Sequence, residues 1–193
     1  MIEKQVWSEN VLLVDADYLD RTAFDLIVNF ERMINRPIPP ADLCRWLDCV
    51  VLDGGLRPGN NAIQALFIHS KPKVGFEHFS PASFSAELDG KAFQDNLGEF
   101  TMHSFPVEDM IDADAFFVQA LETLVDAEDI KRLMVVGDME CCGDRIKARV
   151  SQAKDKDVTL FAMQPIAGGR GFSQEILGYS LMSALGIRSE ELK

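Results

Sequence analysis

Short apolar runs alternate with amphipathic stretches along most of the chain. Five runs have the length and composition of buried strands: residues 11–15, 62–69, 99–105, 133–137 and 158–163. Several of the stretches between them place apolar residues at the 3.6-residue spacing of helices that bury one face. Strands that alternate with helices predict a three-layer α/β/α domain, whose central sheet of about five strands is mainly parallel.

The amphipathic stretches predict five helices. Their expected ranges are 19–34, 41–53, 113–124, 142–153 and 174–185. Asp112 is well placed to cap the third of these at its N-terminus, because Asp is favoured at that position. Residues 84–97 have room for one further short helix.

The chain has the length and the hydrophobic content of one domain, with 193 residues of which 47% are hydrophobic. No Gly/Ser-rich or Pro-rich linker divides it. We therefore expect a single domain over residues 1–193, in which residues 164–193 form a C-terminal loop and helix extension. Three glycines surround Arg170 in the loop.

The pattern gives no sign of secretion or membrane insertion. Residues 1–7 lack the basic start and the long apolar stretch of a signal peptide. No apolar run approaches the roughly 20 residues that cross a bilayer. The four cysteines show no metal-ligand spacing, and the adjacent Cys141 and Cys142 are expected as reduced thiols. We expect a cytoplasmic protein.

Charge is distributed unevenly along the chain. The whole sequence carries −12, but residues 131–193 carry +2 and the first 130 residues carry −14. Because nucleic-acid affinity comes largely from neutralised phosphates, such an acidic chain is a poor general binder of nucleic acid. Any RNA partner is therefore expected to approach through the C-terminal third.

Acidic residues follow two of the expected strands directly. Asp15 and Asp17 come at the end of the first run, and Asp138 and Glu140 come after the fourth. In open α/β sheets, ligands bind beyond the carboxyl ends of the strands. Carboxylates gathered there repel each other unless a cation neutralises them, which points to Mg²⁺ or Mn²⁺ and to phosphoryl chemistry.

Three acidic motifs occur in a recognisable order along the chain. They are Val-Asp15-Ala-Asp17-Tyr-Leu, Ile-Asp112-Ala-Asp114-Ala-Phe-Phe and Val-Gly137-Asp138-Met-Glu140. This order resembles the PIN-like superfamily and, within it, the NYN domains, which are metal-dependent ribonucleases. The resemblance covers about residues 11 to 163 and implies a PIN-like, Rossmann-like α/β fold.

The resemblance also implies roles for individual residues. Asp15, Asp114, Asp138 and Glu140 would hold one or two Mg²⁺ or Mn²⁺ ions, and the three aspartates among them would be catalytic. Such ions can generate a hydroxide nucleophile and stabilise the oxygens of an in-line displacement. Asp17, Asp112 and Arg170 are secondary candidates: the first two are also natural helix caps, and Arg170 could reach a phosphate.

The chain departs from the NYN pattern at two positions within these motifs. Tyr18 stands where those domains usually have Asn, and Glu140 stands where they usually have a second Asp. In addition, no basic residue precedes the middle motif in the stretch 107–111. A member of the family that has lost catalysis therefore remains an alternative.

A second enzyme class shares part of the pattern, the haloacid dehalogenase-like phosphatases. In that scheme Asp15 would be the nucleophile, Asp17 the general acid and Ser70 the residue that holds the phosphoryl group. Asp138 and Asp144 would complete the site. The Lys that those enzymes place before the late Gly-Asp motif is missing here.

The third alternative is a non-catalytic α/β interaction or regulatory module. The acidic first two-thirds of the chain favours it. An aromatic-rich segment could cover a protein partner or a contact in a homo-oligomer, although core packing is the simpler interpretation. This segment contains Phe76, Phe79, Phe84, Phe93 and Phe100.

Overall fold

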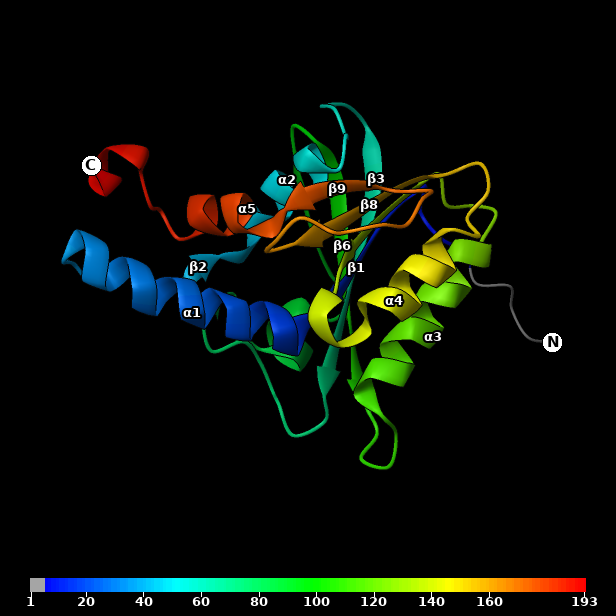
Figure 1. The fold of residues 1–193 in the computed structure, drawn as a ribbon, viewed down its shortest axis with the longest axis horizontal. Helices are drawn as coiled ribbons and strands as arrows, with labels where there is room; N and C mark the ends of the chain where they lie inside the picture. The colour runs from blue at the N-terminus through cyan, green and yellow to red at the C-terminus, as the bar shows by residue number, and fades with distance from the viewer. Residues whose placement is uncertain (1–5) are drawn as a thin grey trace.

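A seven-stranded sheet runs through the middle of the computed structural model, which describes residues 6–193 (Figure 1). The strand order is β5-β6-β3-β1-β7-β8-β9, and every neighbouring pair is parallel except β5 and β6. The strands are β1 Asn10–Asp15, β3 Asn61–Ser70, β5 Lys91–Asp95, β6 Gly98–Val107, β7 Arg132–Val136, β8 Asp157–Ala162 and β9 Ser173–Ile176. The predicted α/β class with a mainly parallel sheet is confirmed.

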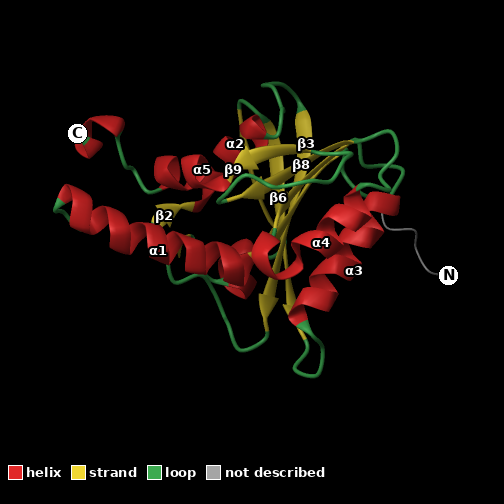
Figure 2. Cartoon of the chain, in the orientation of Figure 1, coloured by secondary structure: helices red, strands yellow, loops and turns green. Residues whose placement is uncertain are grey.

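Helices cover both faces of this sheet (Figure 2). One face packs against α1, α2 and α5, and the other packs against α3 and α4. Their bounds are α1 Ala16–Ile34, α2 Leu43–Asp53, α3 Ala113–Asp126, α4 Met139–Val150 and α5 Leu177–Ala184. The three-layer arrangement expected from the sequence is therefore present.

Strand β1 occupies the centre of the sheet and pairs with β3 on one side and β7 on the other. Its residues Val11 to Val14 are completely buried, because side chains on both faces contact the helical layers. The chain first builds outward from β1 through β3 to β6, and then returns to the other side with β7. The carboxyl ends of β1 and β7 therefore mark the point where the strand order reverses.

The largest departure from the predicted elements lies near the C-terminus. The expected helix over 174–185 was wrong at its start, because Ser173–Ile176 forms β9 and the helix begins at Leu177. Strand β9 pairs with β8 and satisfies the backbone groups of what would otherwise be the edge of the sheet. Its side chains are mostly exposed, so they lack the apolar periodicity that marks a strand in sequence.

The segment 84–97 does hold a short helix, a single π-helical turn at Phe84–Leu88. The rest of the segment was not expected to be a strand, but it contains β5, which forms a hairpin with β6. Gly98 closes the hairpin with a φ of 138°, and a Cβ there would collide with the backbone of Asn61. The hairpin signal was weak in the sequence, because β5 exposes polar residues on most of its length.

Three other helix starts were also shifted from their expected positions, and the first of these helices, α1, begins at Ala16 rather than at Leu19 because Asp15 caps it. Helix α4 begins at Met139 rather than at Cys142, because Asp138 caps it. Helix α2 begins at Leu43, since Ala41–Asp42 forms β2, a short strand paired with β4 at Phe79–Ser80.

The aromatic-rich segment belongs to the core. Four of its five phenylalanines are buried, and Phe93 stacks on Phe100 with a centroid separation of 4.6 Å. The core-packing interpretation is therefore confirmed for these residues. No helix in the part of the chain that the structure describes is long and apolar enough to span a membrane. The expectation about a signal peptide rests largely on residues 1–5, which lie outside the described residues.

Candidate functional site

Asp15 ends β1 and caps the helix that follows it. Its Oδ1 accepts a hydrogen bond from the backbone N–H of Tyr18 at 3.1 Å. The pKa of Asp15 is raised from its ordinary value of 3.8 to about 6, mainly by burial and also by the nearby charges of Asp17 and Asp114, against the opposing influence of the Tyr18 amide and Arg21. An ionised Asp15 is therefore costly, and a cation placed against it would relieve that cost.

Asp138 faces the same edge from β7. Its Oδ1 caps α4 by accepting the N–H groups of Glu140 and Cys141 at 3.1 and 3.2 Å. Its Oδ2 lies 3.4 Å from Nη2 of Arg21, a residue of α1. The Asp138 side chain is 13% exposed and that of Arg21 is 63% exposed. A largely exposed guanidinium therefore neutralises a well-covered carboxylate at this point.

Asp112 and Asp114 belong to the start of α3. Asp112 is the helix cap that the sequence predicted, since its Oδ1 accepts the N–H of Asp114 at 3.0 Å. Asp114 lies in the first turn, where the positive end of the helix dipole favours a carboxylate. Its charge is felt by Asp15, so the middle acidic motif does approach the first one.

The pKa of Cys142 is influenced by Asp15, Asp114 and Asp138. Its pKa is raised to about 12, mainly by burial and also by the charges of Asp114, Asp138 and Asp15. Its Sγ donates to the backbone carbonyl of Asp138 at 3.2 Å. Cys142 is therefore a protonated structural thiol that lies within the electrostatic influence of all three aspartates.

These acids do not form a ready-made coordination shell. Within residues 6–193, no group of three or more His, Cys, Asp or Glu side chains has an arrangement that could hold a metal ion. Both oxygens of Asp138 are engaged, one by helix amides and the other by Arg21. The aspartates therefore influence one another electrostatically without forming a coordination shell. Their carboxylate oxygens are the donor type that a hard divalent cation prefers.

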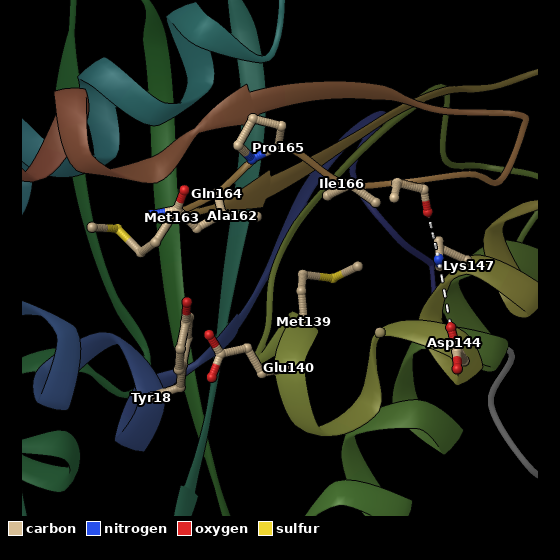
Figure 3. A pocket seen from close by; sticks show the side chains of 12 residues that line it. Tyr18, Met139, Glu140, Asp144, Lys147, Ala162, Met163, Gln164, Pro165 and Ile166 are labelled. Atoms are coloured by element: carbon tan, nitrogen blue, oxygen red, sulfur yellow. Dashed lines mark hydrogen bonds and ion pairs between the residues drawn. The ribbon is translucent and has the colours of Figure 1, made fainter.

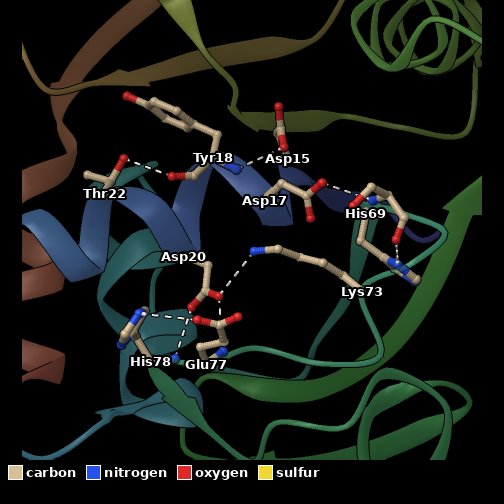
Figure 4. Close-up of polar contacts among 10 residues, drawn as sticks. Asp15, Asp17, Tyr18, Asp20, Thr22, His69, Lys73, Glu77 and His78 are labelled. Carbon is tan, nitrogen blue, oxygen red and sulfur yellow. Dashed lines mark hydrogen bonds and ion pairs between the residues drawn. The ribbon is translucent and has the colours of Figure 1, made fainter.

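Asp17 has a different neighbour, the end of β3. Its Oδ2 accepts the backbone N–H of Ser70 at 3.0 Å (Figure 4). Its Oδ1 is buried and has no hydrogen-bond partner among the residues that the structure describes. Asp17 therefore ties β3 to the first turn of α1 and occupies the Ser70 amide.

Asp20 is a polar residue of this region that sequence reasoning missed. It is 2% exposed and accepts the backbone N–H groups of Glu77 and His78, each at 3.0 Å. Nζ of Lys73 lies 3.5 Å from its Oδ2 (Figure 4). Asp20 lies on the buried face of α1, one turn after Ala16, and an acid within an apolar stripe was the signal that could have found it. It fastens the segment after β3 to α1.

A pocket of about 230 Å³ opens beside the acidic edge. Tyr18 of α1 lies on one side, and Met139 and Glu140 of α4 lie next to it (Figure 3). The segment from Ala162 to Ala167, which follows β8, forms the opposite wall. The pocket borders the acids because Tyr18 is one turn beyond Asp15, and Met139 follows Asp138 directly.

The pocket wall after β8 is held by two side chains. Gln174 contacts both backbone groups of Ile166: its Oε1 accepts the N–H at 2.7 Å, and its Nε2 donates to the carbonyl at 3.3 Å. Nζ of Lys147 donates to the carbonyl of Ala167 at 2.8 Å and lies 3.5 Å from a carboxylate oxygen of Asp144. Sequence patterns gave no indication of this wall, because its contacts join residues far apart in the chain.

The remaining predicted residues lie at the margin of the site. Glu140 is exposed, and its side chain points toward Tyr18 (Figure 3). Arg170 is also exposed, and within residues 6–193 its side chain makes no hydrogen bond or ion pair. Asp15, Asp114 and Asp138 are thus linked through their electrostatic influence on Cys142, and not through a shared arrangement of their side chains.

One family model matches the chain, over residues 4–192, and its description is a family of unknown function, DUF6621. No curated protein and no solved structure matches the chain. Since the match spans nearly the whole sequence, the chain belongs to the DUF6621 family.

Proposed function

We propose that this protein is a metal-dependent phosphodiesterase of the PIN/NYN type that acts on RNA. Asp15, Asp114 and Asp138 would hold one Mg²⁺ or Mn²⁺ ion at the edge between β1 and β7. The observation that supports the proposal is the position of Asp15 at the end of β1, where the strand order reverses. Burial and the nearby charges of Asp17 and Asp114 raise its pKa there, as is common at functional sites. A cation bound there would supply an activated water and stabilise charge on the phosphate oxygens.

Arg21 has to release Asp138 before that carboxylate can bind a metal. The ion pair is long at 3.4 Å, and the arginine is mostly solvent-exposed. Such pairs contribute little free energy, about 0–1 kcal/mol, so a divalent cation can displace the guanidinium at small cost. The released Arg21 would remain near the edge, where its planar group suits a phosphate.

RNA would approach from the side of α4 and the loop after β8. Helix α4 carries Arg145, Lys147 and Arg149, and the loop carries Arg170. This placement agrees with the positive balance of the C-terminal third and with the importance of phosphate neutralisation in RNA binding.

The phosphatase alternative is less well supported. Its scheme needs Ser70 to hold a phosphoryl group and Asp17 to act as an acid, but these two residues bond to each other. The Arg21–Asp138 ion pair instead favours a second candidate, a non-catalytic module in which the arginine has taken over the role of the metal.

A thermal-shift experiment with Mn²⁺ separates these functions. We expect Mn²⁺ to raise the melting temperature of the wild-type protein but not that of Asp138→Asn. Asp25→Asn, an exposed change on α1, serves as the matched control and should keep the shift. Cleavage of a short single-stranded RNA in Mn²⁺ should disappear in Asp15→Asn. A wild-type protein that neither responds to Mn²⁺ nor cleaves RNA is the non-catalytic module.

A further inference from the structure

The pocket beside the acidic edge has the size of a single ring system. Its volume of about 230 Å³ lies below the roughly 300–1,000 Å³ of sites that take drug-sized ligands. Apolar side chains, among them Met139, Met163 and Ile166, line much of it together with the ring of Tyr18. Apolar walls that include an aromatic ring suit a planar ligand that stacks.

Polar groups sit at one end of this pocket. Figure 3 shows the Glu140 carboxylate beside the Tyr18 ring, whose hydroxyl points toward Met163 and Gln164. Burial raises the pKa of Tyr18, and the charges of Asp138 and Glu140 raise it further. The Tyr18 hydroxyl therefore stays protonated and can donate a hydrogen bond.

The charges around the pocket do not suit a phosphate. Glu140 and Asp144 both line it, and the one ammonium that faces them, Nζ of Lys147, already binds the Ala167 carbonyl. A carboxylate accepts hydrogen bonds and cannot donate them. A neutral ligand that offers N–H groups is therefore favoured over an anionic one.

We propose that this pocket binds one unstacked base of an RNA strand, with guanine preferred. Guanine presents two adjacent N–H donors, at N1 and N2, to the two oxygens of the Glu140 carboxylate. Adenine and cytosine each offer one amino group beside an acceptor nitrogen, and uracil flanks its single N–H with two carbonyls. Recognition of unstacked bases by stacking and by their Watson–Crick edges is the common mode for single-stranded RNA.

This inference deepens the proposed function and rests on it for the cleavage site. A base in the pocket would lie against Tyr18 and Glu140, so its phosphate would lie near Asp15 and Asp138, which are their neighbours along the chain. The pocket would then select the nucleotide next to the bond that the acidic edge cleaves. Glu140 is thereby assigned to the substrate and not to the cation.

The test is binding of the four neutral ribonucleosides to the full chain in EDTA, measured by calorimetry. We expect guanosine to bind about tenfold or more tightly than the other three. In Glu140→Gln that preference should fall to within about twofold, and the control Glu190→Gln, an exposed residue outside the pocket, should keep it. Equal binding of all four nucleosides, or a preference that survives Glu140→Gln, overturns the inference.

The aromatic wall is tested with a second pair of variants. Tyr18→Phe keeps the ring and should retain binding, while Tyr18→Leu should weaken the binding of all four nucleosides by about fivefold or more. Because Tyr18 packs partly on the core, circular dichroism must first show that Tyr18→Leu is folded. If it is not, Glu140→Gln decides alone, since that side chain is exposed.

Failure of the inference differs from failure of the proposed function. Asp15→Asn should lose RNA cleavage in Mn²⁺ but still bind guanosine in EDTA. A wild-type protein that shows no cleavage refutes the phosphodiesterase and leaves the binding result to stand. A protein that cleaves RNA without any base preference refutes the pocket assignment.

Discussion

Arg21 and Asp138 form an ion pair that joins α1 to the start of α4, with Nη2 of the arginine 3.4 Å from Oδ2 of the aspartate. The guanidinium also lies 5.9 Å from the ring centre of Tyr18. One exposed side chain therefore contacts both the acidic edge and the aromatic wall of the pocket. This position makes Arg21 a competitor of any cation that binds Asp138.

Arg21→Ala is expected to strengthen Mn²⁺ binding by about two- to fivefold, because a competing positive charge worth about 0–1 kcal/mol is removed. The measurement is the Mn²⁺ dependence of the melting temperature or calorimetry. Arg32→Ala, an exposed change in the last turn of the same helix, should leave the affinity unchanged. An unaltered Mn²⁺ affinity in Arg21→Ala would show that Arg21 does not compete with Mn²⁺ for Asp138.

Mn²⁺ affinity should also rise with pH. A pKa of about 6 for Asp15 means that a proton competes with the metal below this value. Binding should therefore be weak at pH 5 and approach its maximum above pH 7, as followed by calorimetry. In Asp15→Asn this rise of Mn²⁺ affinity with pH should vanish. A rise that persists would assign the titration to another group.

Asp15 should reduce stability at neutral pH. Its pKa is raised in the folded state, so its contribution to stability is fully present below 3.8 and is lost as the pH rises through about 6. Asn caps helices as well as Asp does, so Asp15→Asn keeps the cap of α1. We expect this variant to melt at a higher temperature than the wild type at pH 7.5 and at a similar temperature near pH 4. A lower melting temperature at pH 7.5 would contradict this account.

A second pH dependence should come from Asp48. Its pKa is raised to about 7, mainly by burial and also by a hydrogen bond shared with Asp95. These residues lie on α2 and β5, so deprotonation places two like charges between a helix and the edge hairpin. Stability should fall as the pH rises from about 4 through 7.

Thermal melts across this pH range provide the measurement, with Asp48→Asn as the test variant. We expect its melting temperature to depend less on pH than that of the wild type. Asp25→Asn should reproduce the wild-type slope. If Asp48→Asn keeps the full slope, the Asp48–Asp95 pair is not its source.

Asp20 is expected to be the most sensitive of the acids for folding. Asp20→Ala leaves two buried backbone amides and the Lys73 ammonium without their acceptor, which should cost about 3–5 kcal/mol of unfolding free energy. Urea denaturation measures this loss. Asp25→Ala on the exposed face of α1 should cost under about 0.5 kcal/mol. Similar stabilities of the two variants would show that Asp20 does not fasten the segment after β3.

The sequence predicted the fold best where buried apolar residues follow one another or recur at regular spacing along the chain. Strands β1 and β7 are continuous apolar runs, and the acids that follow them cap helices, so both the strands and the place of Asp15 and Asp138 could be predicted. Strand β9 could not, because its side chains are mostly exposed and its stability comes from backbone pairing with β8.

The candidate site was predictable only in part for a related reason. Arg21, Asp95 and Gln174 acquire their roles from residues far away in the sequence, and each looks like an ordinary surface residue within its own segment. The direction of Glu140, toward Tyr18, depends on how α4 begins, and that start was predicted three residues too late. Local patterns locate caps and strands, whereas partners across the fold need the tertiary arrangement.

The double contact of Gln174 with Ile166 means that one side of the pocket is already fixed before any ligand arrives. A ligand therefore does not have to immobilise this stretch of chain, and the conformational entropy lost on association stays small. The same rigidity penalises a larger ring system, because the backbone at Ile166 cannot retreat without breaking two hydrogen bonds. The pocket would thus select its ligand by shape as well as by charge.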